Sequence, residues 1–221
     1  MIVYMVDKGG EYITPEEHIR RHPKLGKRNL YVNITNRCTC SCTFCLRNMK
    51  KMDDSVTLWL KKEPSSAEVK KALDGAPWKY IKEVVFCGFG EPTERLDVLT
   101  DLLRYVKTMH PDVATRLNTN GLSDLSYGRD TSPDFDGDIL DTVSISLNAS
   151  NAERYLELTR SRFGIKSYEA MLSFAQNMKK YVPNIVLTIV DHVEGEDEIA
   201  RCRAICESRG LTLRVRPYED H

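Results

Sequence analysis

The sequence predicts an α/β protein in which parallel strands alternate with helices. Stretches rich in β-branched residues recur along the chain, and stretches with apolar residues at helical spacing fill the gaps between them. Such alternation implies parallel strands joined by right-handed crossovers. Six strand–helix units are too few for a closed eight-fold barrel, so the expected fold is a partial barrel or an open doubly wound sheet. In either fold the ligand site lies at the carboxyl ends of the strands.

The N-terminal residues 1–28 fall outside this alternation. Val3 to Val6 and Glu11 to Ile13 flank Gly9-Gly10, a pattern that predicts a hairpin. We therefore expect an N-terminal extension over residues 1–28 and one core domain over residues 29–221.

The six predicted core strands are short and end at turn residues or at polar loops. In chain order they are Leu30 to Thr35, Glu83 to Cys87, Val113 to Asn118, Thr142 to Asn148, Ile185 to Val190 and Leu211 to Arg216.

Four helices are predicted between the strands. The first begins with a capping box of Ser65 and Glu68, Pro111 ends the second, and Gly210 ends the last. Their apolar faces consist of Val69, Ala72 and Leu73, of Leu96, Leu99, Leu103 and Val106, of Tyr168, Met171, Leu172, Ala175 and Met178, and of Ile199, Cys202, Ile205 and Cys206.

The composition excludes several classes of protein. Lysine plus arginine and aspartate plus glutamate both number 32 in 221 residues, and this balance argues against a general polyanion binder. No apolar run approaches a membrane span, and charged residues soon follow the N-terminus, so we expect neither a membrane protein nor a secretory signal. Seven cysteines without such a signal indicate a reducing, cytoplasmic setting.

Three cysteines follow the first core strand at the spacing Cys-x3-Cys-x2-Cys. Cys38, Cys42 and Cys45 lie too close together for separate structural roles and are interpreted as ligands of one metal centre. A cubane iron–sulfur cluster normally takes four cysteines, so three leave one iron open for a substrate or cofactor. The alternative is a zinc knot with Cys40 as the fourth ligand, although the usual second Cys-x2-Cys or His pair is missing.

A second motif, Cys87 to Thr93 with the sequence Cys-Gly-Phe-Gly-Glu-Pro-Thr, follows the second core strand. Its glycines allow close approach of a ligand to the backbone, and Glu91 offers an acceptor for an amine. A plain strand-to-helix turn would give the same pattern.

Together the two motifs resemble the radical S-adenosylmethionine (radical SAM) enzymes. That family has Cys-x3-Cys-x2-Cys after its first strand, with an aromatic residue before the last cysteine, and Phe44 fills this place. It also has a Gly-Gly-Glu-Pro-like stretch after its second strand, which here reads Gly88-Phe89-Gly90-Glu91-Pro92, a slight variant. The resemblance covers most of residues 29–217 and implies a partial (β/α)6 TIM-like barrel.

The resemblance also implies the cofactors and their ligands. Cys38, Cys42 and Cys45 would hold a [4Fe–4S] cluster whose open iron binds the methionine part of S-adenosylmethionine, and Gly88, Gly90 and Glu91 would contact its amine. Reduction by a flavodoxin or ferredoxin type of electron donor would release a 5′-deoxyadenosyl radical, which abstracts hydrogen from a substrate that the sequence does not identify.

The later strands carry further polar candidates. Ser144, Ser146 and Asn148 share one face of the fourth core strand, which indicates a wet, ligand-lined cavity. By resemblance these residues contact the ribose or the methionine carboxylate. Arg160 resembles an arginine that pairs with this carboxylate, and the alternative is a solvated helix-end charge.

Two other segments allow a functional and a structural interpretation. Asn118, Thr119 and Asn120 end the third core strand in the manner of the family's ribose-contacting turn, or form a simple Asn-Gly turn. Arg214 and Arg216 alternate with apolar residues on the sixth strand, and they either face a cavity and bind a carboxylate or phosphate or lie in solvent on an edge strand.

Four remaining residues have open roles. Asp191 and His192 follow the fifth core strand and could transfer protons. Cys40 lies outside the ligand pattern, and Cys87 could be a catalytic thiol, although a buried small side chain is the simpler interpretation.

Within the family, several stretches are similar to the small radical SAM proteins encoded beside TatD-type nucleases, which predicts a functional link to such a nuclease. These stretches are Tyr31 to Cys38, Leu58 to Leu60, Phe86 to Thr93 and Arg116 to Leu122. Two alternatives remain: a relative resembling 7-carboxy-7-deazaguanine synthase, which uses magnesium and rearranges a pterin, and a zinc-stabilised nucleic-acid adaptor. The adaptor would bind phosphates through Arg37, Arg47, Lys50 and Lys51.

Overall fold

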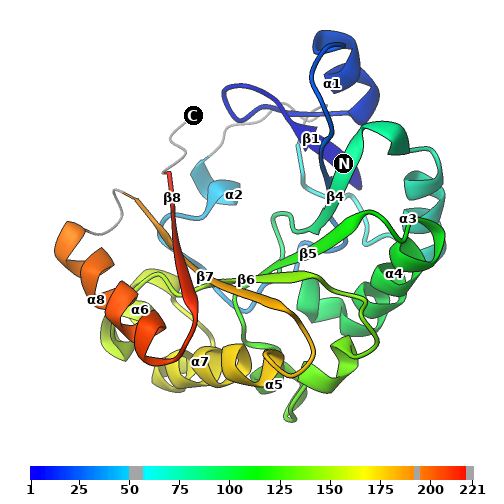
Figure 1. Cartoon of the computed structure of the whole chain (residues 1–221). Helices are drawn as coiled ribbons and strands as arrows, with labels where there is room; N and C mark the ends of the chain where they lie inside the picture. The colour runs from blue at the N-terminus through cyan, green and yellow to red at the C-terminus, as the bar shows by residue number, and fades with distance from the viewer. Residues whose placement is uncertain (50–56, 192–194, 218–221) are drawn as a thin grey trace.

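A computed structural model describes residues 1–49, 57–191 and 195–217 of the chain. Its centre is one eight-stranded sheet in the order β2-β1-β3-β4-β5-β6-β7-β8, in which β3 to β8 run parallel. Figure 1 shows that the sheet curls into an open arc with helices along its outer side. The strands are β1 (Val3–Val6), β2 (Tyr12–Ile13), β3 (Arg28–Val32), β4 (Ile81–Phe86), β5 (Ala114–Thr119), β6 (Thr142–Ser146), β7 (Asn184–Val190) and β8 (Thr212–Arg216).

The predicted partial barrel with six parallel strands is confirmed. Strands β3 and β6 end earlier than expected, at Val32 and Ser146, because beyond these residues the chain leaves the ladder and enters the loops of the site. The helices are α1 (Pro15–Arg21), α2 (Leu46–Met49), α3 (Ser66–Asp74), α4 (Leu96–Met109), α5 (Ser123–Tyr127), α6 (Ala152–Thr159), α7 (Ser167–Met178) and α8 (Glu196–Ser208). Short 3-10 turns are η1 (Trp78–Tyr80), η2 (Pro92–Arg95), η3 (Ser132–Phe135) and η4 (Gly164–Lys166).

The four predicted helices correspond to α3, α4, α7 and α8. The capping box at the start of α3 forms as expected, since Ser65 accepts from the Glu68 backbone N–H and the Glu68 side chain accepts from that of Ser65. The short helices α1, α2, α5 and α6 were not predicted. For α1 a signal was present, because Thr14 caps the helix and Pro15 occupies its first turn.

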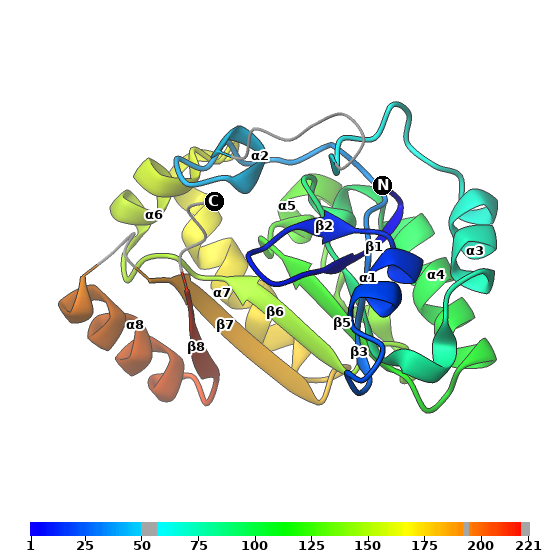
Figure 2. The ribbon, with the colours of Figure 1, turned by 90° about the horizontal axis from the view of Figure 1, so that it is seen from above.

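The predicted N-terminal hairpin is confirmed and is joined to the main sheet. Strand β1 pairs antiparallel with β2 on one side and with β3 on the other, with Tyr4 opposite Tyr31. The hairpin therefore lengthens the arc at the β3 end (Figure 2), and its side chains reach the concave side of the sheet.

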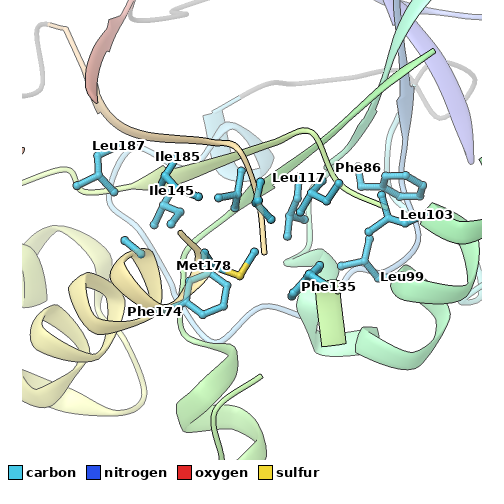
Figure 3. Close-up of a cluster of buried hydrophobic side chains, with 14 of the residues drawn as sticks. Phe86, Leu99, Leu103, Leu117, Phe135, Ile145, Phe174, Met178, Ile185 and Leu187 are labelled. Atoms are coloured by element: carbon cyan, nitrogen blue, oxygen red, sulfur yellow. The ribbon is translucent and has the colours of Figure 1, made fainter. Parts of the chain in front are cut away.

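The two faces of the sheet differ in polarity. The outer face carries buried apolar residues that pack against α4 and α7, and Figure 3 shows this core. On β6, for example, Val143 and Ile145 are fully buried in this core, whereas Ser144 and Ser146 point to the concave side. No helix among the described residues is long and apolar enough to cross a membrane.

Truncation of this core should lower stability strongly. Leu117 on β5 is fully buried between the sheet and the helices, so Leu117→Ala should reduce the free energy of unfolding by about 3 kcal/mol through lost burial and a residual cavity. Leu25→Ala is the matched control, because Leu25 is 54% exposed. Urea denaturation of both variants measures the difference, and equal midpoints would contradict the assigned core.

Candidate cofactor site

A cavity of about 570 Å³ lies on the concave side of the sheet and reaches the carboxyl ends of β3 to β8. The residues from its cysteine loop are Cys38, Cys40, Cys42, Phe44, Cys45, Leu46 and Arg47. Those from the loop after β4 are Cys87, Gly88, Phe89, Gly90 and Glu91. The two motifs found in the sequence therefore face one space.

The cysteine loop is fixed by main-chain hydrogen bonds to the end of α6. Ser41 and Thr43 donate their backbone N–H groups to the carbonyls of Thr159 and Leu158, both at 2.9 Å. In return Arg162 donates its N–H to the Thr39 carbonyl at 3.0 Å. These bonds hold the thiols in place without using any cysteine side chain.

The thiols of the loop are packed closely enough to influence one another. The hydrogen bond with Cys40 and burial raise the pKa of the Cys38 thiol well above its usual range. The Asn120 side chain donates to Thr39 Oγ1 at 3.0 Å and lies 4.0 Å from the Cys38 sulfur. Because metal ligands must be thiolates, a metal centre here binds with release of protons.

The separation of the sulfur atoms distinguishes between metal centres. A tetrahedral zinc ion with Zn–S bonds of about 2.3 Å needs sulfur atoms about 3.8 Å apart. Among the described residues, the one group of three His, Cys, Asp or Glu ligand atoms within 4.8 Å of one another is Asp7, His18 and His22. Cys38, Cys42 and Cys45 are not such a group, so at least one pair of their sulfur atoms lies more than 4.8 Å apart, as a cluster in which each cysteine binds a different iron allows.

The group of Asp7, His18 and His22 is a hydrogen-bond network around α1. His22 Nε2 lies 2.5 Å from Asp7 Oδ1, and His18 Nδ1 lies 2.8 Å from the guanidinium of Arg28. The positive charge of Arg28 beside His18 Nδ1 would repel a metal cation at this position. The hydrogen bonds of the group instead hold α1 against β1 and β3.

The Glu91 carboxylate is the most connected side chain of the site. It is 4% exposed and accepts from the N–H and hydroxyl of Thr93 at 3.1 and 2.9 Å, from the Thr119 hydroxyl at 2.7 Å and from the Asn120 N–H at 2.7 Å. The Glu91 backbone N–H donates to the Arg37 carbonyl at 2.7 Å. One residue thus ties the ends of β4 and β5 to the start of the cysteine loop.

Burial raises the pKa of Glu91, and its hydrogen bonds with Asn120, Thr119 and Thr93 oppose the rise. Oε1 accepts three of the four bonds and Oε2 only one, so Oε2 retains capacity for a further donor. An amine at this oxygen would be compatible with the geometry.

The glycines next to Glu91 are required by the packing of the chain itself. A Cβ on Gly88 would lie 2.2 Å from Asn33 Oδ1, and one on Gly90 would lie 2.3 Å from the Thr35 carbonyl. The sequence pattern predicted close approach of a ligand to these glycines. The structure shows close approach of the segment that leads from β3 to the cysteines.

Most of the predicted site residues line the cavity. The later strands contribute Asn118, Thr119, Asn120, Ser146 and Asn148. Asn148 has a left-handed backbone, with φ of +60°, a conformation that asparagine adopts more readily than most residues.

Three predicted residues lie elsewhere. Pro92 is buried at the start of η2, and Ser144 is buried and accepts from Arg214 Nη2 at 3.1 Å. Arg160 is the exposed C-terminal cap of α6 and is not among the residues that line the cavity. His192, predicted with Asp191 as a proton-transfer candidate, and Lys50 and Lys51 lie outside the described residues.

Several lining residues were missed in the sequence. Tyr4, Tyr12 and Tyr31 form an aromatic wall with ring centroids 5.3 Å apart in the Tyr4–Tyr12 and Tyr4–Tyr31 pairs. Tyr155 on α6 is 1% exposed, and its hydroxyl has no hydrogen-bond partner among the described residues. Of these missed residues and Arg116, the sequence pattern could have predicted Arg116 as a cavity residue, because it shares a strand face with Asn118.

Comparison with known proteins agrees with this geometry. The sequence model of the Radical SAM superfamily matches residues 32–203, which include both motifs. The chain belongs to the radical SAM superfamily. Members of this superfamily use an iron–sulfur cluster and S-adenosylmethionine.

Two curated proteins with similar sequences are GTP 3′,8-cyclases. The one from Corynebacterium glutamicum (strain R) is 32% identical over 197 residues, which are 85% of this chain and 48% of the relative. The probable GTP 3′,8-cyclase of Methanopyrus kandleri is 28% identical over 165 residues, which are 73% of this chain and 48% of the relative. The chain therefore spans about half the length of these relatives.

Among solved structures, the radical SAM fold is shared with Streptococcus suis SuiB bound to precursor peptide SuiA. The TM-score is 0.67 at 17% sequence identity, and the match covers 92% of this chain and 42% of SuiB. At this identity the likeness establishes the partial barrel and leaves the substrate open.

Removal of the Glu91 carboxylate should loosen the site. Glu91→Ala leaves the Thr93, Thr119 and Asn120 donors without their acceptor, so the free energy of unfolding should fall by about 3 kcal/mol. Glu91→Gln keeps the shape of the side chain and a carbonyl oxygen with two acceptor lone pairs. Its free energy of unfolding should therefore fall less than that of Glu91→Ala. Chemical denaturation measures both variants, with Glu94→Gln, on the neighbouring turn, as the control. Equal stability of Glu91→Ala and the unchanged chain would contradict the anchoring role.

Proposed function

We propose that the chain binds one [4Fe–4S] cluster through Cys38, Cys42 and Cys45, and S-adenosylmethionine beside it. The observation that carries this proposal is that the cysteine loop and the Gly88–Glu91 stretch, far apart in the sequence, line one cavity. Each of the three cysteines is partly exposed and lines this cavity, so a cluster in the cavity can reach all three thiols.

When bound, the reduced cluster and S-adenosylmethionine supply a 5′-deoxyadenosyl radical for hydrogen abstraction. The protein supplies position and exclusion of water. Asn120 orients the cysteine loop through Thr39, and Glu91 holds Asn120 in place. Buried Leu58 and Phe89 cover part of the cavity and limit the access of water to it.

The cofactor also needs polar contacts, and the cavity offers buried groups that lack partners. Asn118 Oδ1 and the Tyr155 hydroxyl have no hydrogen-bond partner among the described residues, and both residues line the cavity. A buried polar group without a partner costs about 1–3 kcal/mol, so hydroxyl, amine or carboxylate groups of the cofactor would relieve this cost.

The zinc-adaptor alternative fits the structure less well. Arg37 is paired with Glu63 at 2.9 Å, and Arg47 donates to the Cys40 carbonyl at 3.1 Å. Two of the four basic residues proposed for phosphate contacts therefore already have partners within the chain, and the sulfurs of the cysteine loop do not form a ready group of three ligand atoms within 4.8 Å of one another.

The proposal includes partners that the chain itself does not identify. A flavodoxin or ferredoxin type of donor would reduce the cluster in the cytoplasm, and the functional link to a TatD-type nuclease stays a prediction. A 7-carboxy-7-deazaguanine-synthase-like reaction remains the second candidate, and dependence of activity on a pterin and magnesium would distinguish it.

Loss of the three ligand thiols should abolish the cluster. The triple variant Cys38→Ala, Cys42→Ala and Cys45→Ala should lose iron and sulfide after anaerobic reconstitution, whereas Cys40→Ala should keep them. Cys202→Ala is the matched control, because Cys202 is fully buried in α8 outside the cavity. Normal iron content in the triple variant would overturn the ligand assignment.

Cleavage of S-adenosylmethionine tests the proposed function directly. The reconstituted and reduced protein should contain about four irons per chain, as one cubane cluster requires, and should form 5′-deoxyadenosine. Both are measured on the same sample, with the triple cysteine variant as the blank. Bound zinc in place of iron, with no 5′-deoxyadenosine, would reject the proposal in favour of the adaptor.

A further inference from the structure

Four arginines line the cavity; Arg47 donates to the Cys40 carbonyl, and the other three have no role in binding the cluster or in the proposed contacts of the cofactor. Arg116 lies on β5, and Arg214 and Arg216 lie on β8. We call them the arginine group. Strand β8 is the edge of the sheet, but the sheet curls, so that its side chains share the cavity with those of β1 and β5.

Arg116 is the most enclosed member of the arginine group. Its side chain is 14% exposed and pairs with Glu83, at 3.0 Å between Nη2 and Oε2, on the adjacent strand β4. Its Nε–H is buried and has no acceptor among the described residues. This arrangement leaves a charged donor incompletely satisfied, which is costly in a buried setting.

Arg214 and Arg216 lack a carboxylate partner within ion-pair distance in the described part of the chain. In the described part of the chain Arg214 donates to the neutral hydroxyl of Ser144, at 3.1 Å, and the residue is exposed. Burial and then the positive charges of Arg116 and Arg216 lower the pKa of Arg214. The charges of Arg116, Arg214 and Arg216 are therefore close enough to influence one another, and Glu83 is the carboxylate that pairs with this group among the described residues.

The charge balance of the described residues at this end of the cavity indicates which kind of anion would fit there. The arginine group carries three positive charges, and over residues 1–49, 57–191 and 195–217 the one carboxylate paired with it is Glu83. The nearby Tyr31 and Cys87 do not supply negative charge, because burial raises the pKa of both side chains. The surplus of two positive charges matches a phosphate dianion better than a single carboxylate, and planar guanidinium groups suit its oxygens.

We propose that the arginine group binds a phosphate group of the substrate. This proposal rests on the proposed function, since it places the substrate in the same cavity as the cofactor. The phosphate oxygens would accept from Arg214, Arg216 and the unsatisfied Nε–H of Arg116, with Glu83 limiting the total charge. The substrate is accordingly a phosphorylated small molecule.

Phosphate binding tests this proposal separately from catalysis. Isothermal titration calorimetry of the reconstituted protein, without S-adenosylmethionine or reductant, uses inorganic phosphate and acetate at matched ionic strength. Arg214→Gln and Arg216→Gln should each weaken phosphate binding about tenfold or more, because each removes a charge-assisted hydrogen bond. Glu83→Gln should strengthen it several-fold, because it removes the competing carboxylate beside Arg116.

Arg129→Gln is the matched control. Arg129 is half exposed, pairs with Asp134 and lies outside the cavity, so this substitution should leave phosphate affinity unchanged. Circular dichroism confirms the folding of each variant, and the gain expected for Glu83→Gln cannot arise from misfolding.

Two results would overturn the proposal. The first is absence of phosphate binding, or equal phosphate affinity in the unchanged chain and in Arg214→Gln and Arg216→Gln. The second is acetate binding as tightly as phosphate with the same response to these variants, which would assign a carboxylate instead. Iron content and 5′-deoxyadenosine formation, measured on the same preparations, show separately whether the proposed function itself holds.

Discussion

The site depends on the burial of one carboxylate. Glu91 is almost fully removed from water, and its charge is stabilised by four donors from the loops after β4 and β5. Its backbone N–H holds the carbonyl of Arg37 immediately before Cys38. Burying a carboxylate is costly unless donors replace the lost water, so the three segments adopt one mutual arrangement, and this arrangement sets the position of the cysteines.

The two faces of the sheet divide apolar burial and polar side chains between them. Its outer face forms the hydrophobic core with α4 and α7, which provides the stability, while the concave face carries polar side chains. Several of these polar groups lack partners among the described residues, including Asn118 Oδ1 and Arg116 Nε. Buried polar groups normally have a hydrogen-bond partner, so these atoms mark the places in the cavity where a bound molecule could be recognised.

The openness of the barrel explains how distant segments meet in one cavity. In the strand order, β1 and β8 lie near opposite ends of the sheet, yet Tyr4 on β1 and Arg214 on β8 line the same space. The N-terminal hairpin thereby supplies aromatic side chains and the last strand supplies charge. The proposed cofactor end and the proposed phosphate end of the cavity meet on β5, which carries Arg116 near its middle and Asn118 and Thr119 at its carboxyl end.

The sequence by itself determined the parallel strands, the longer helices, the N-terminal hairpin and the two motifs of the cofactor site. These features depend on local periodicity and on spacing along the chain, which are visible in the order of residues. The tertiary structure alone decided that Glu91 is an anchor, that Gly88 and Gly90 make room for the chain, and that Arg160 lies outside the cavity. It also brought Arg116, Arg214 and the tyrosines of the hairpin together. Such contacts arise from strand register and from the curl of the sheet, which join residues that are far apart in the sequence and carry no local pattern.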